Sequence, residues 1–302
     1  MNQVVPFGPK LSIILGLIAT AIVLLCGCQP SHSGRIIVGS KNFTEQVILA
    51  EFMAQHIESR LHVPVERRFY LAGSYIAHQA VLADRIDIYP EYTGTALTAI
   101  LKESPNWDAN EVFNQVREAY EKRFHLTVIQ PFGFNNSFAM VMRGADARKL
   151  GISTLSEARP FAPQWTFGCG YEFLERPDGF PGFVRRYGLS FRDKPRVMDL
   201  GLLYRALESH QIDLAAGNGT DGLIAALDMA VLKDDLHYFP PYEAVPVVND
   251  DAMRRFAGLA SALEELANTI SDEEMRRLNY ALDGQHRDVV EVVKEFREKK
   301  GL

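Results

Sequence analysis

Apolar and polar residues alternate along the first third of the chain with a period that switches between two and about 3.6 residues. The shorter period is typical of strands and the longer one of amphipathic helices. The pattern predicts strands at 35–40, 65–70 and 86–89, and helices at 44–61, 75–83 and 95–101. This alternation predicts an α/β fold with helices on both faces of a parallel or mixed sheet.

The middle of the chain is less regular. It predicts a helix at 109–123, an extended stretch at 126–142, a short helix beyond Asp146, a break at 160–163 and an irregular, glycine-rich segment at 168–188. From Pro195 the earlier order restarts, with predicted strands at 196–200 and 212–215 and helices at 202–210 and 223–229. The tail, 250–302, reads as helical, and Ser271 with Glu274 makes a capping box.

A weak internal repeat links the two halves. Ala80-Val81 stands six residues before Ile86-Asp87, and Ala206-Leu207 stands six before Ile212-Asp213. One interpretation is two α/β units that each present a strand-end turn to a shared crevice, where ligands of open α/β sheets bind. The alternative is that strand–helix–strand units look alike by chance.

The N-terminus carries an uncharged apolar run at 11–28 that follows Lys10 and ends Leu25-Cys26-Gly27-Cys28. This predicts a signal peptide at 1–27, and its end resembles a bacterial lipoprotein box, which implies cleavage before Cys28 and acylation of that thiol. Residues 28–34 would then be a polar tether. The alternative is an uncleaved membrane anchor, because about 18 apolar residues can just span a bilayer. Both interpretations hold a globular domain outside the cytoplasm.

Charge and cysteine content narrow the classes of partner. The formal net charge is −6 and no basic cluster stands out, so nucleic acid is not expected as a partner. Beyond the apolar run only Cys169 remains, so no intramolecular disulfide is expected there. We expect a buried structural thiol rather than a reactive one.

Catalytic and metal-binding motifs are missing from the sequence. It has no phosphate-binding loop, no His-Glu-x-x-His, no Gly-x-Ser-x-Gly and no metal-spaced cysteines, and its eight histidines are scattered. We therefore expect no enzyme, no cofactor and no metal. The alternative is an exported enzyme acting on a small methylated amine, with Glu91 and Asp221 as facing carboxylates. A ligand-sensing regulator would need a DNA-binding or kinase segment, which this chain has no room for.

The segment 86–95 carries the strongest hint of binding. We predict a turn there that presents Tyr89, Glu91, Tyr92 and Thr93 where a strand stops and a helix begins. With Tyr204 in the second unit, these rings suit a cation without N–H donors, such as a trimethylammonium group. A carboxylate at the other end of such a ligand could bind at the helix start around Asn42, Thr44 and Gln46.

Several separated motifs resemble the substrate-binding proteins of osmoprotectant ABC importers, which take up glycine betaine, choline, carnitine and related quaternary amines. They are Gly39-Ser-Lys-Asn-Phe-Thr-Glu-Gln46, Asp87-Ile-Tyr-Pro-Glu-Tyr-Thr-Gly-Thr95, Gly133-Phe-Asn-Asn136, and Asp234-Asp235 with Phe239-Pro-Pro-Tyr242. The resemblance covers about Ile36 to Leu302.

The resemblance implies a two-lobed periplasmic-binding-protein fold, type II-like, with two crossover strands and a C-terminal helical tail. Lobe one would be 35–135 plus 246–302, and lobe two 136–245. A monomer would trap a small zwitterion or quaternary amine between the lobes and deliver it to a membrane permease driven by a cytoplasmic ATPase. The candidate ligand-binding residues are Asn42, Thr44, Gln46, Tyr89, Glu91, Tyr92, Thr93, Asn136, Phe138, Tyr204, Asn218, Thr220 and Asp221.

Two positions depart from the pattern of that family. Relatives typically carry an aromatic residue just before Ser-Thr-Asp-Gly, where this chain has Asn218 before Gly219-Thr220-Asp221-Gly222. They often have Tyr after Asn-Asn-Thr, where this chain has Phe138. A larger betaine with its own hydrogen-bonding group would suit Asn218.

Overall fold

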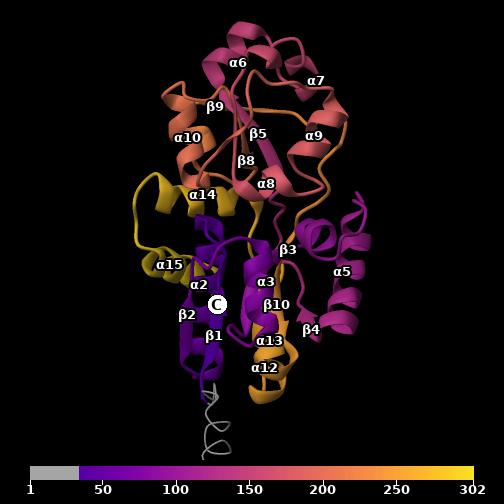
Figure 1. Cartoon of the computed structure of the whole chain (residues 1–302). Coiled ribbons are helices and arrows are strands. Elements are labelled where there is room, and N and C mark those ends of the chain that lie inside the picture. Colours follow the sequence, from indigo (N-terminus) through magenta and orange to yellow (C-terminus); the bar gives the residue numbers. More distant parts are fainter. Residues whose placement is uncertain (1–33) are drawn as a thin grey trace, which may run out of the picture. The chain divides into compact units, whose positions relative to one another are not determined.

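The computed structural model describes residues 34–302, so the predicted signal peptide and Cys28 lie outside the described residues. Within that range no helix has both the length and the apolar character needed to cross a bilayer. Residues 36–302 form one compact unit that contains two five-stranded mixed sheets (Figure 1).

The first sheet has the strand order β2-β1-β3-β10-β4. Strands β1, β2 and β3 run parallel, and β10 runs antiparallel to β3 and β4. The strands are β1 (Ile36–Gly39), β2 (Val65–Arg68), β3 (Ile88–Tyr92), β4 (Leu126–Val128) and β10 (Ala244–Asn249). The helices between them are α2 (Thr44–Leu61), α3 (Ser74–Leu82), α4 (Thr93–Thr95), a π-helical turn (Ala96–Ile100) and α5 (Ala109–Phe124).

The second sheet repeats this pattern in the order β7-β6-β8-β5-β9, with β6, β7 and β8 parallel and β5 antiparallel to β8 and β9. Its strands are β5 (Phe138–Arg143), β6 (Phe167–Cys169), β7 (Arg196–Val197), β8 (Leu214–Asn218) and β9 (Met229–Leu232). Its helices are α6 (Gly144–Leu150), α7 (Leu155–Ala158), a 3-10 turn (Ala162–Gln164), α8 (Tyr171–Glu175), α9 (Phe180–Tyr187), α10 (Leu200–Glu208) and α11 (Leu223–Ala226).

The predicted repeat is present down to individual hydrogen bonds. In the first sheet the Ile37 N–H donates to Asp87 Oδ2 at 2.7 Å, and in the second the Thr166 N–H donates to Asp213 Oδ2 at 2.8 Å. Each aspartate also pairs with an arginine, Arg255 and Arg143 respectively. Each lobe is built on one sheet. In both lobes, an aspartate just before the third parallel strand, β3 or β8, accepts a backbone hydrogen bond from the start of the first one.

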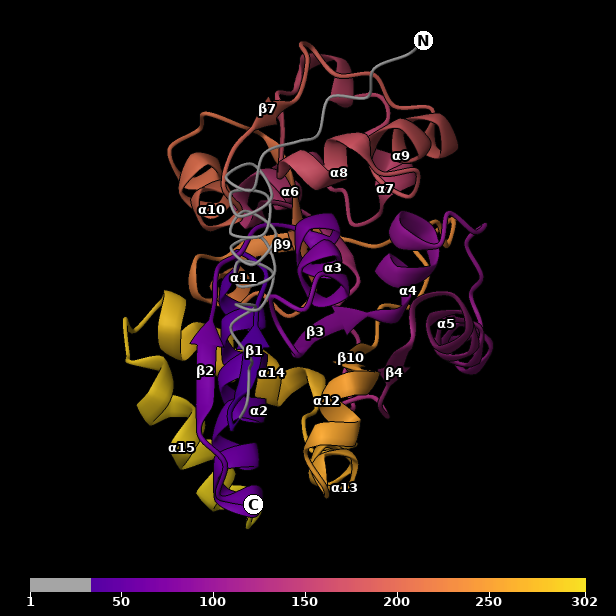
Figure 2. The same cartoon turned by 60° about the horizontal axis from the view of Figure 1, so that its bottom comes forward.

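The chain passes between the sheets twice, at 129–137 and at 233–243, and the two passages lie side by side, with the Asn136 N–H donating to the Tyr242 carbonyl at 3.0 Å. The tail then forms α12 (Asp250–Arg255), α13 (Leu259–Glu264), α14 (Asp272–Asp283) and α15 (Val289–Lys300). The last three pack on α2, as Figure 2 shows for α14 and α15. The α/β two-lobed fold is thus confirmed, while the exact lobe boundaries stay a prediction.

The predicted turn at 86–95 is wrong, because β3 continues through Pro90, Glu91 and Tyr92 with all five residues buried. Proline is disfavoured in the middle of a central strand because it has no N–H to donate to the neighbouring strand. Here Pro90 lies opposite Pro246 of β10, whose carbonyl accepts from the Ile129 N–H on its other side, so the two prolines meet at a position where β3 and β10 exchange no hydrogen bond. A residue-by-residue pattern could not reveal this partner, which lies far along the chain.

The segment 168–188 is also more regular than predicted, since it contains the end of β6 and helices α8 and α9. Its glycines mark element ends: Gly170 and Gly179 are N-caps, and Gly188 ends α9 with a φ of 60°. Glycine is favoured at such a left-handed C-terminal position. In addition, the predicted helix at 223–229 stops at Ala226, and β9 follows it.

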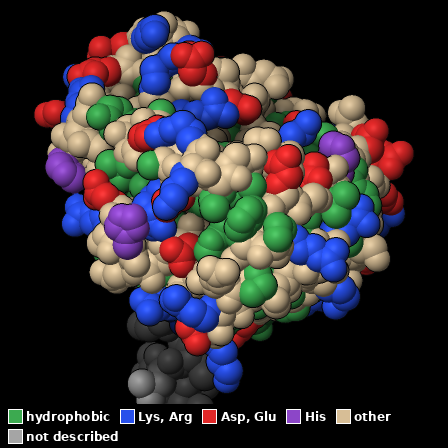
Figure 3. Space-filling view, turned by 90° about the horizontal axis from the view of Figure 1, so that it is seen from above, with side chains coloured by type: hydrophobic (Ala, Val, Ile, Leu, Met, Phe, Trp, Pro, Cys, Tyr) green, Lys and Arg blue, Asp and Glu red, His purple; other side chains and the backbone are tan. Residues whose placement is uncertain are grey.

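Other predictions are confirmed. Helix α2 has the predicted bounds, and its N-cap is Phe43. Ser271 and Glu274 form the capping box of α14. Cys169 is a buried free thiol, and burial raises its pKa to about 11, which suits a structural role. On the face shown in Figure 3, cationic and anionic side chains are interspersed around a group of hydrophobic ones.

Candidate functional site

A cavity of about 90 Å³ lies between the two lobes; we call it the aromatic cavity. The first lobe contributes the loop after β1, the start of α3 and the end of β3. The second lobe contributes the start of β5, helix α8, the start of α10 and the end of β8. Its lining residues are Lys41, Asn42, Phe43, Ser74, Tyr92, Thr95, Asn136, Phe138, Gly170, Tyr171, Glu172, Phe173, Arg176, Met198, Asp199, Leu200, Ala216, Asn218 and Tyr242.

Aromatic rings form much of this wall. The Phe43 and Tyr92 rings stack with centroids 6.3 Å apart and planes 18° apart. The Phe138 and Tyr242 rings meet edge to face, with centroids 5.5 Å apart. Tyr92 ends β3, Phe138 begins β5 and Tyr242 lies in the second passage between the sheets. Rings from both lobes and from the connection between them therefore face one volume.

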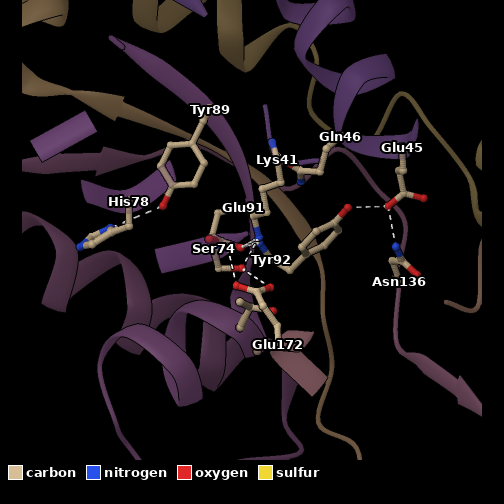
Figure 4. Close-up of polar contacts among 12 residues, drawn as sticks. Lys41, Glu45, Gln46, Ser74, His78, Tyr89, Glu91, Tyr92, Asn136 and Glu172 are labelled. Atoms are coloured by element: carbon tan, nitrogen blue, oxygen red, sulfur yellow. Dashed lines mark hydrogen bonds and ion pairs between the residues drawn. The ribbon is translucent and has the colours of Figure 1, made fainter. Parts of the chain in front are cut away.

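Two buried cations line the same cavity, one from each lobe. The Lys41 ammonium forms an ion pair with Glu91, lies 2.8 Å from Ser74 Oγ, and sits 4.9 Å from the centre of the Tyr92 ring (Figure 4). The Arg176 guanidinium pairs with Asp178 and donates from Nη1 to Thr95 Oγ1 at 3.0 Å. Burying such charges is costly unless they are paired, so each carries its own carboxylate.

Glu45 is a hub beside this cavity. One of its carboxylate oxygens accepts from the Tyr92 hydroxyl and the Asn136 amide, both at 2.7 Å (Figure 4). The other accepts from the Thr220 hydroxyl at 2.5 Å and the Asn279 amide at 3.1 Å. Burial raises the pKa of Glu45 to about 7 despite these four donors. One side chain thus joins the first lobe, the passage between lobes, the second lobe and the tail.

A second cavity of about 390 Å³ adjoins the first; we call it the acidic cavity. It lies between the start of α2 and the start of α10. Among residues 34–302, four carboxylates line it, and its basic groups are Arg205 and His286. Burial raises the pKa of Asp221 to about 6 and also raises that of Asp283. The lining residues are Asn42, Phe43, Thr44, Glu45, Tyr70, Asp199, Leu200, Gly201, Leu202, Tyr204, Arg205, Asn218, Asp221, Leu223, Leu282, Asp283 and His286.

Hydrogen bonds also cross between the lobes at the start of α3. The Gly73 N–H donates to the Tyr171 hydroxyl at 2.8 Å, and the Ser74 N–H donates to Glu172 Oε1 at 2.6 Å. A carboxylate of the opposite lobe therefore caps the N-terminus of α3. Its negative charge interacts favourably with the positive end of the helix dipole. The lobes are in contact in this structure.

The structure brings eight of the thirteen predicted residues to these cavities. The aromatic cavity is lined by Tyr92, Asn136 and Phe138, the acidic cavity by Thr44, Tyr204 and Asp221, and both by Asn42 and Asn218. Because four carboxylates surround the start of α2, that helix end is a poor place for the ligand carboxylate expected there.

Five predicted residues line neither cavity. Tyr89 lies in the core on the opposite face of β3, Glu91 is paired with Lys41, and Thr93 accepts from the Glu243 N–H at 3.1 Å. Gln46 accepts from the Lys41 N–H, and Thr220 donates to Glu45. These side chains support the walls rather than form them.

The most important residues that the sequence analysis missed are Glu45, Lys41, Arg176 and Tyr242. Lys41, Glu45 and Tyr242 lie inside the motifs that carry the family resemblance, so those motifs could have indicated them as site residues. Arg176, with Asp178 two residues later, lies in the segment expected to be irregular, and no local pattern pointed to it.

Comparison with known proteins agrees with this geometry. Residues 34–299 match the family model described as the substrate binding domain of ABC-type glycine betaine transport systems. The chain belongs to this OpuAC family. It is therefore a substrate-binding protein of a transport system, of the extracytoplasmic class, rather than an enzyme.

Several relatives are similar over most of the chain. The carnitine transport binding protein OpuCC of Listeria monocytogenes is 32% identical, over 94% of each chain. A glycine-betaine-binding protein of Pseudomonas aeruginosa is 34% identical, over 92% of this chain and 91% of that one. An ergothioneine transport permease/binding protein of Helicobacter pylori is 32% identical over 97% of this chain, which spans about half (52%) of its length.

A solved structure supports the family fold. The crystal structure of a glycine betaine/carnitine/choline ABC transporter protein matches with a TM-score of 0.73 at 32% identity, covering 88% of this chain and 98% of that one. The fold described above is therefore shared with this protein.

Proposed function

We propose that the chain is the lipid-anchored substrate-binding protein of an ABC importer, and that it captures a small quaternary-amine zwitterion in the aromatic cavity. The observation that carries this proposal is the composition of the cavity wall: aromatic rings from both lobes together with one buried cation from each lobe. A site of this kind has a place for each end of a betaine.

The carboxylate end is the better defined of the two. Arginine has five N–H donors, of which Asp178 and Thr95 accept three, and Lys41 has three, of which Ser74 and Glu91 accept two. The remaining donors can bind a carboxylate between the lobes. Charge-assisted hydrogen bonds of this type are about twice as strong as neutral ones.

The ammonium end is assigned to the other side of the cavity. Lys41 and Arg176 line only the aromatic cavity, whereas Phe43, Asp199 and Asn218 line both cavities and so mark the side nearest the acidic one. A trimethylammonium there meets the Phe43 ring, which stacks with Tyr92, and the Asp199 carboxylate. Each ring contributes about 0.5–2 kcal/mol once water is excluded. Several rings supply a useful share of the roughly 8 kcal/mol of micromolar binding.

Transport is the expected purpose of this binding. The name of the family implies a permease partner, and the predicted lipoprotein box implies that Cys28 is acylated and holds the protein at the outer side of a membrane. Mass measurement of the N-terminal peptide of the protein isolated from membranes tests the anchor: a lipid-modified Cys28 as the first residue supports acylation, and an uncleaved or unmodified N-terminus contradicts it.

Calorimetry with matched ligands tests the binding function. Glycine betaine has both charges, choline lacks the carboxylate, and 3,3-dimethylbutanoate replaces the ammonium nitrogen by carbon. We expect glycine betaine, or another betaine with the same head, to bind more tightly than the analogues that lack either charge. Flat traces for every betaine and methylated amine would contradict the proposal.

A variant pair tests the aromatic wall. Tyr92→Leu removes a ring and is expected to weaken binding at least tenfold, about 1.4 kcal/mol, whereas Tyr92→Phe keeps the ring and weakens it less. Tyr89→Phe, three residues earlier on the opposite face of β3, is the control and is expected to bind like the parent protein. Equal affinities for Tyr92→Leu and Tyr89→Phe would remove Tyr92 from the site.

A further inference from the structure

Helix α14 connects the two lobes in addition to the two passages of the chain. It packs on α2 of the first lobe and on α11 of the second (Figure 1). The turn 218–222, which leads from β8 into α11, rests against it. The Arg276 Nε donates to the Gly219 carbonyl at 3.0 Å, and the Asn279 Nδ2 donates to the Thr220 carbonyl at 2.9 Å. A helix of the C-terminal tail therefore binds a turn of the second lobe.

The backbones of this turn and of α14 touch at Gly222. A methyl group added to Gly222 would lie 2.5 Å from the Tyr280 backbone nitrogen and 2.6 Å from its Cα, which is too close for two unbonded atoms. The backbone of Gly222 has a φ of −67° and a ψ of −25°, a conformation that other residues adopt without strain. Glycine is therefore needed here for the close approach of the turn to α14.

Asn279 links this turn to Glu45. Its Nδ2 donates to the Thr220 carbonyl and also to Glu45 Oε2, at 3.1 Å. The Thr220 hydroxyl donates to the same carboxylate oxygen. The other oxygen of Glu45 accepts from the Tyr92 hydroxyl. A chain of hydrogen bonds therefore runs from α14, through Glu45, to a ring of the aromatic cavity.

The amide of Asn279 is placed for its donors. Its side chain is buried, and its Oδ1 has no hydrogen-bond partner among residues 34–302. A buried acceptor without a partner costs free energy, so the oxygen does not favour an amide at this position. What the amide contributes is the N–H group that bridges Glu45 and Thr220.

We propose that Asn279 is a positioning residue for ligand capture: it ties the second-lobe turn to Glu45, so that contact between the lobes and placement of the Tyr92 hydroxyl occur together. This rests on the proposed function, which assigns Tyr92 to the wall that the ligand contacts. Asn279 itself lines neither cavity, so it acts through Glu45 and Thr220.

A double-mutant cycle tests the proposal by calorimetry with glycine betaine, or with the betaine that the parent protein binds most tightly. Asn279→Leu keeps the branched shape of the side chain and removes its donors, and is expected to weaken binding at least tenfold. In a Tyr92→Phe background, which lacks the hydroxyl, the same substitution is expected to weaken binding threefold or less. Members of one hydrogen-bond network are not additive in this way, whereas independent sites are.

The outcomes of the cycle separate this inference from the proposed function. No loss of affinity on Asn279→Leu, or equal losses in the two backgrounds, overturns the inference and leaves the proposed function standing. A parent protein that binds no betaine removes both. Asn114→Leu makes the matched substitution on the exposed face of α5 and is expected to bind like the parent protein.

Gly222→Ala tests the same contact from the other side. The added methyl group pushes the turn away from α14 and leaves every hydrogen-bonding side chain in place. We expect at least fivefold weaker binding, mainly through faster ligand dissociation in stopped-flow measurements, because the contacts of the closed lobes hold the ligand. Cooperative thermal unfolding shows which variants fold. A folded Gly222→Ala or Asn279→Leu protein with the dissociation rate of the parent overturns the proposal.

Discussion

At the scale of single residues, Glu45 shows how a supporting side chain can govern a binding site. It lines only the acidic cavity, yet it accepts hydrogen bonds from Tyr92 and Asn136 of the aromatic wall. It also accepts from Thr220 of the second lobe. The Glu45 carboxylate therefore fixes the position of the Tyr92 hydroxyl. Glu45 in turn is hydrogen-bonded to Thr220 only while the two lobes are in contact.

The raised pKa of Glu45 predicts how stability depends on pH. Its ordinary value of 4.5 is raised to about 7 by burial, so between these values the folded protein binds more protons than the unfolded chain. The contribution of Glu45 to the free energy of unfolding should then be largest below about pH 4.5. It should decrease as the pH rises from there to about 7. Asp221, with a pKa raised to about 6, acts in the same direction.

Urea unfolding of Glu45→Gln between pH 5 and 8 tests this. The variant is expected to lose much of the decline, which for a shift of this size is at most about 3 kcal/mol. Glu264→Gln, an exposed carboxylate on α13, serves as the control and should keep the decline. If the variant and the parent protein have the same pH profile, Glu45 does not titrate in this window.

At the scale of elements, the paired aspartates tie each helix–strand unit to its own sheet. Asp87 and Asp213 each accept the N–H of a residue at the start of the first parallel strand of their sheet. A buried N–H that loses its acceptor costs about 1–3 kcal/mol. Each aspartate should therefore stabilise its own lobe.

Hydrogen exchange followed by peptide mass measurement separates the two lobes. Asp87→Ala is expected to reduce protection mainly in β1 and β3, and Asp213→Ala mainly in β6 and β8, with a loss of about 1–3 kcal/mol or more in each case. Such a division would also support the lobe boundaries predicted from the sequence. Equal loss of protection over both sheets in either variant would show instead that the lobes unfold as one unit.

At the scale of the whole folded unit, residues 36–302, contacts across the interface hold the lobes together. Glu172 of α8 accepts from the backbone of Ser74 at the start of α3, and the Tyr70 hydroxyl donates to Asp199 at 3.3 Å. Binding by closure of two lobes uses such contacts to stabilise the closed state. Losing one of them should shift the population toward open forms.

Glu172→Ala is expected to lower ligand affinity about fivefold, since a hydrogen bond contributes about 1 kcal/mol. Small-angle scattering of the ligand-free variant should also give a larger radius of gyration than the parent protein, which a mere loss of ligand contact would not. Glu175→Ala, exposed on the same helix, is the control. An unchanged radius together with unchanged affinity would show that this cap does not control closure.

Much of the architecture could be predicted from local pattern, and the errors have identifiable causes. Helix α2 follows directly from its periodicity, and the repeat was visible in two residue pairs. The predicted turn at 86–95 failed because Pro90 stands opposite Pro246, at a position where β3 and β10 exchange no hydrogen bond. Once 88–92 is a strand, alternation puts Tyr89 and Tyr92 on opposite faces, so only Tyr92 can reach the cavity.

The sequence by itself determined most of the order of strands and helices, the family and the presence of aromatic side chains near a crevice, because periodicity and motifs are properties of neighbouring residues. The tertiary structure decided which of those side chains share a volume and which charges accompany them. Lys41, Tyr92, Arg176 and Tyr242 come from separate parts of the chain, and only the contact between two sheets brings them together. The tertiary structure also decided that each cation pairs with its own carboxylate, Lys41 with Glu91 and Arg176 with Asp178. The free-energy cost of burying a charge depends on its neighbours in space.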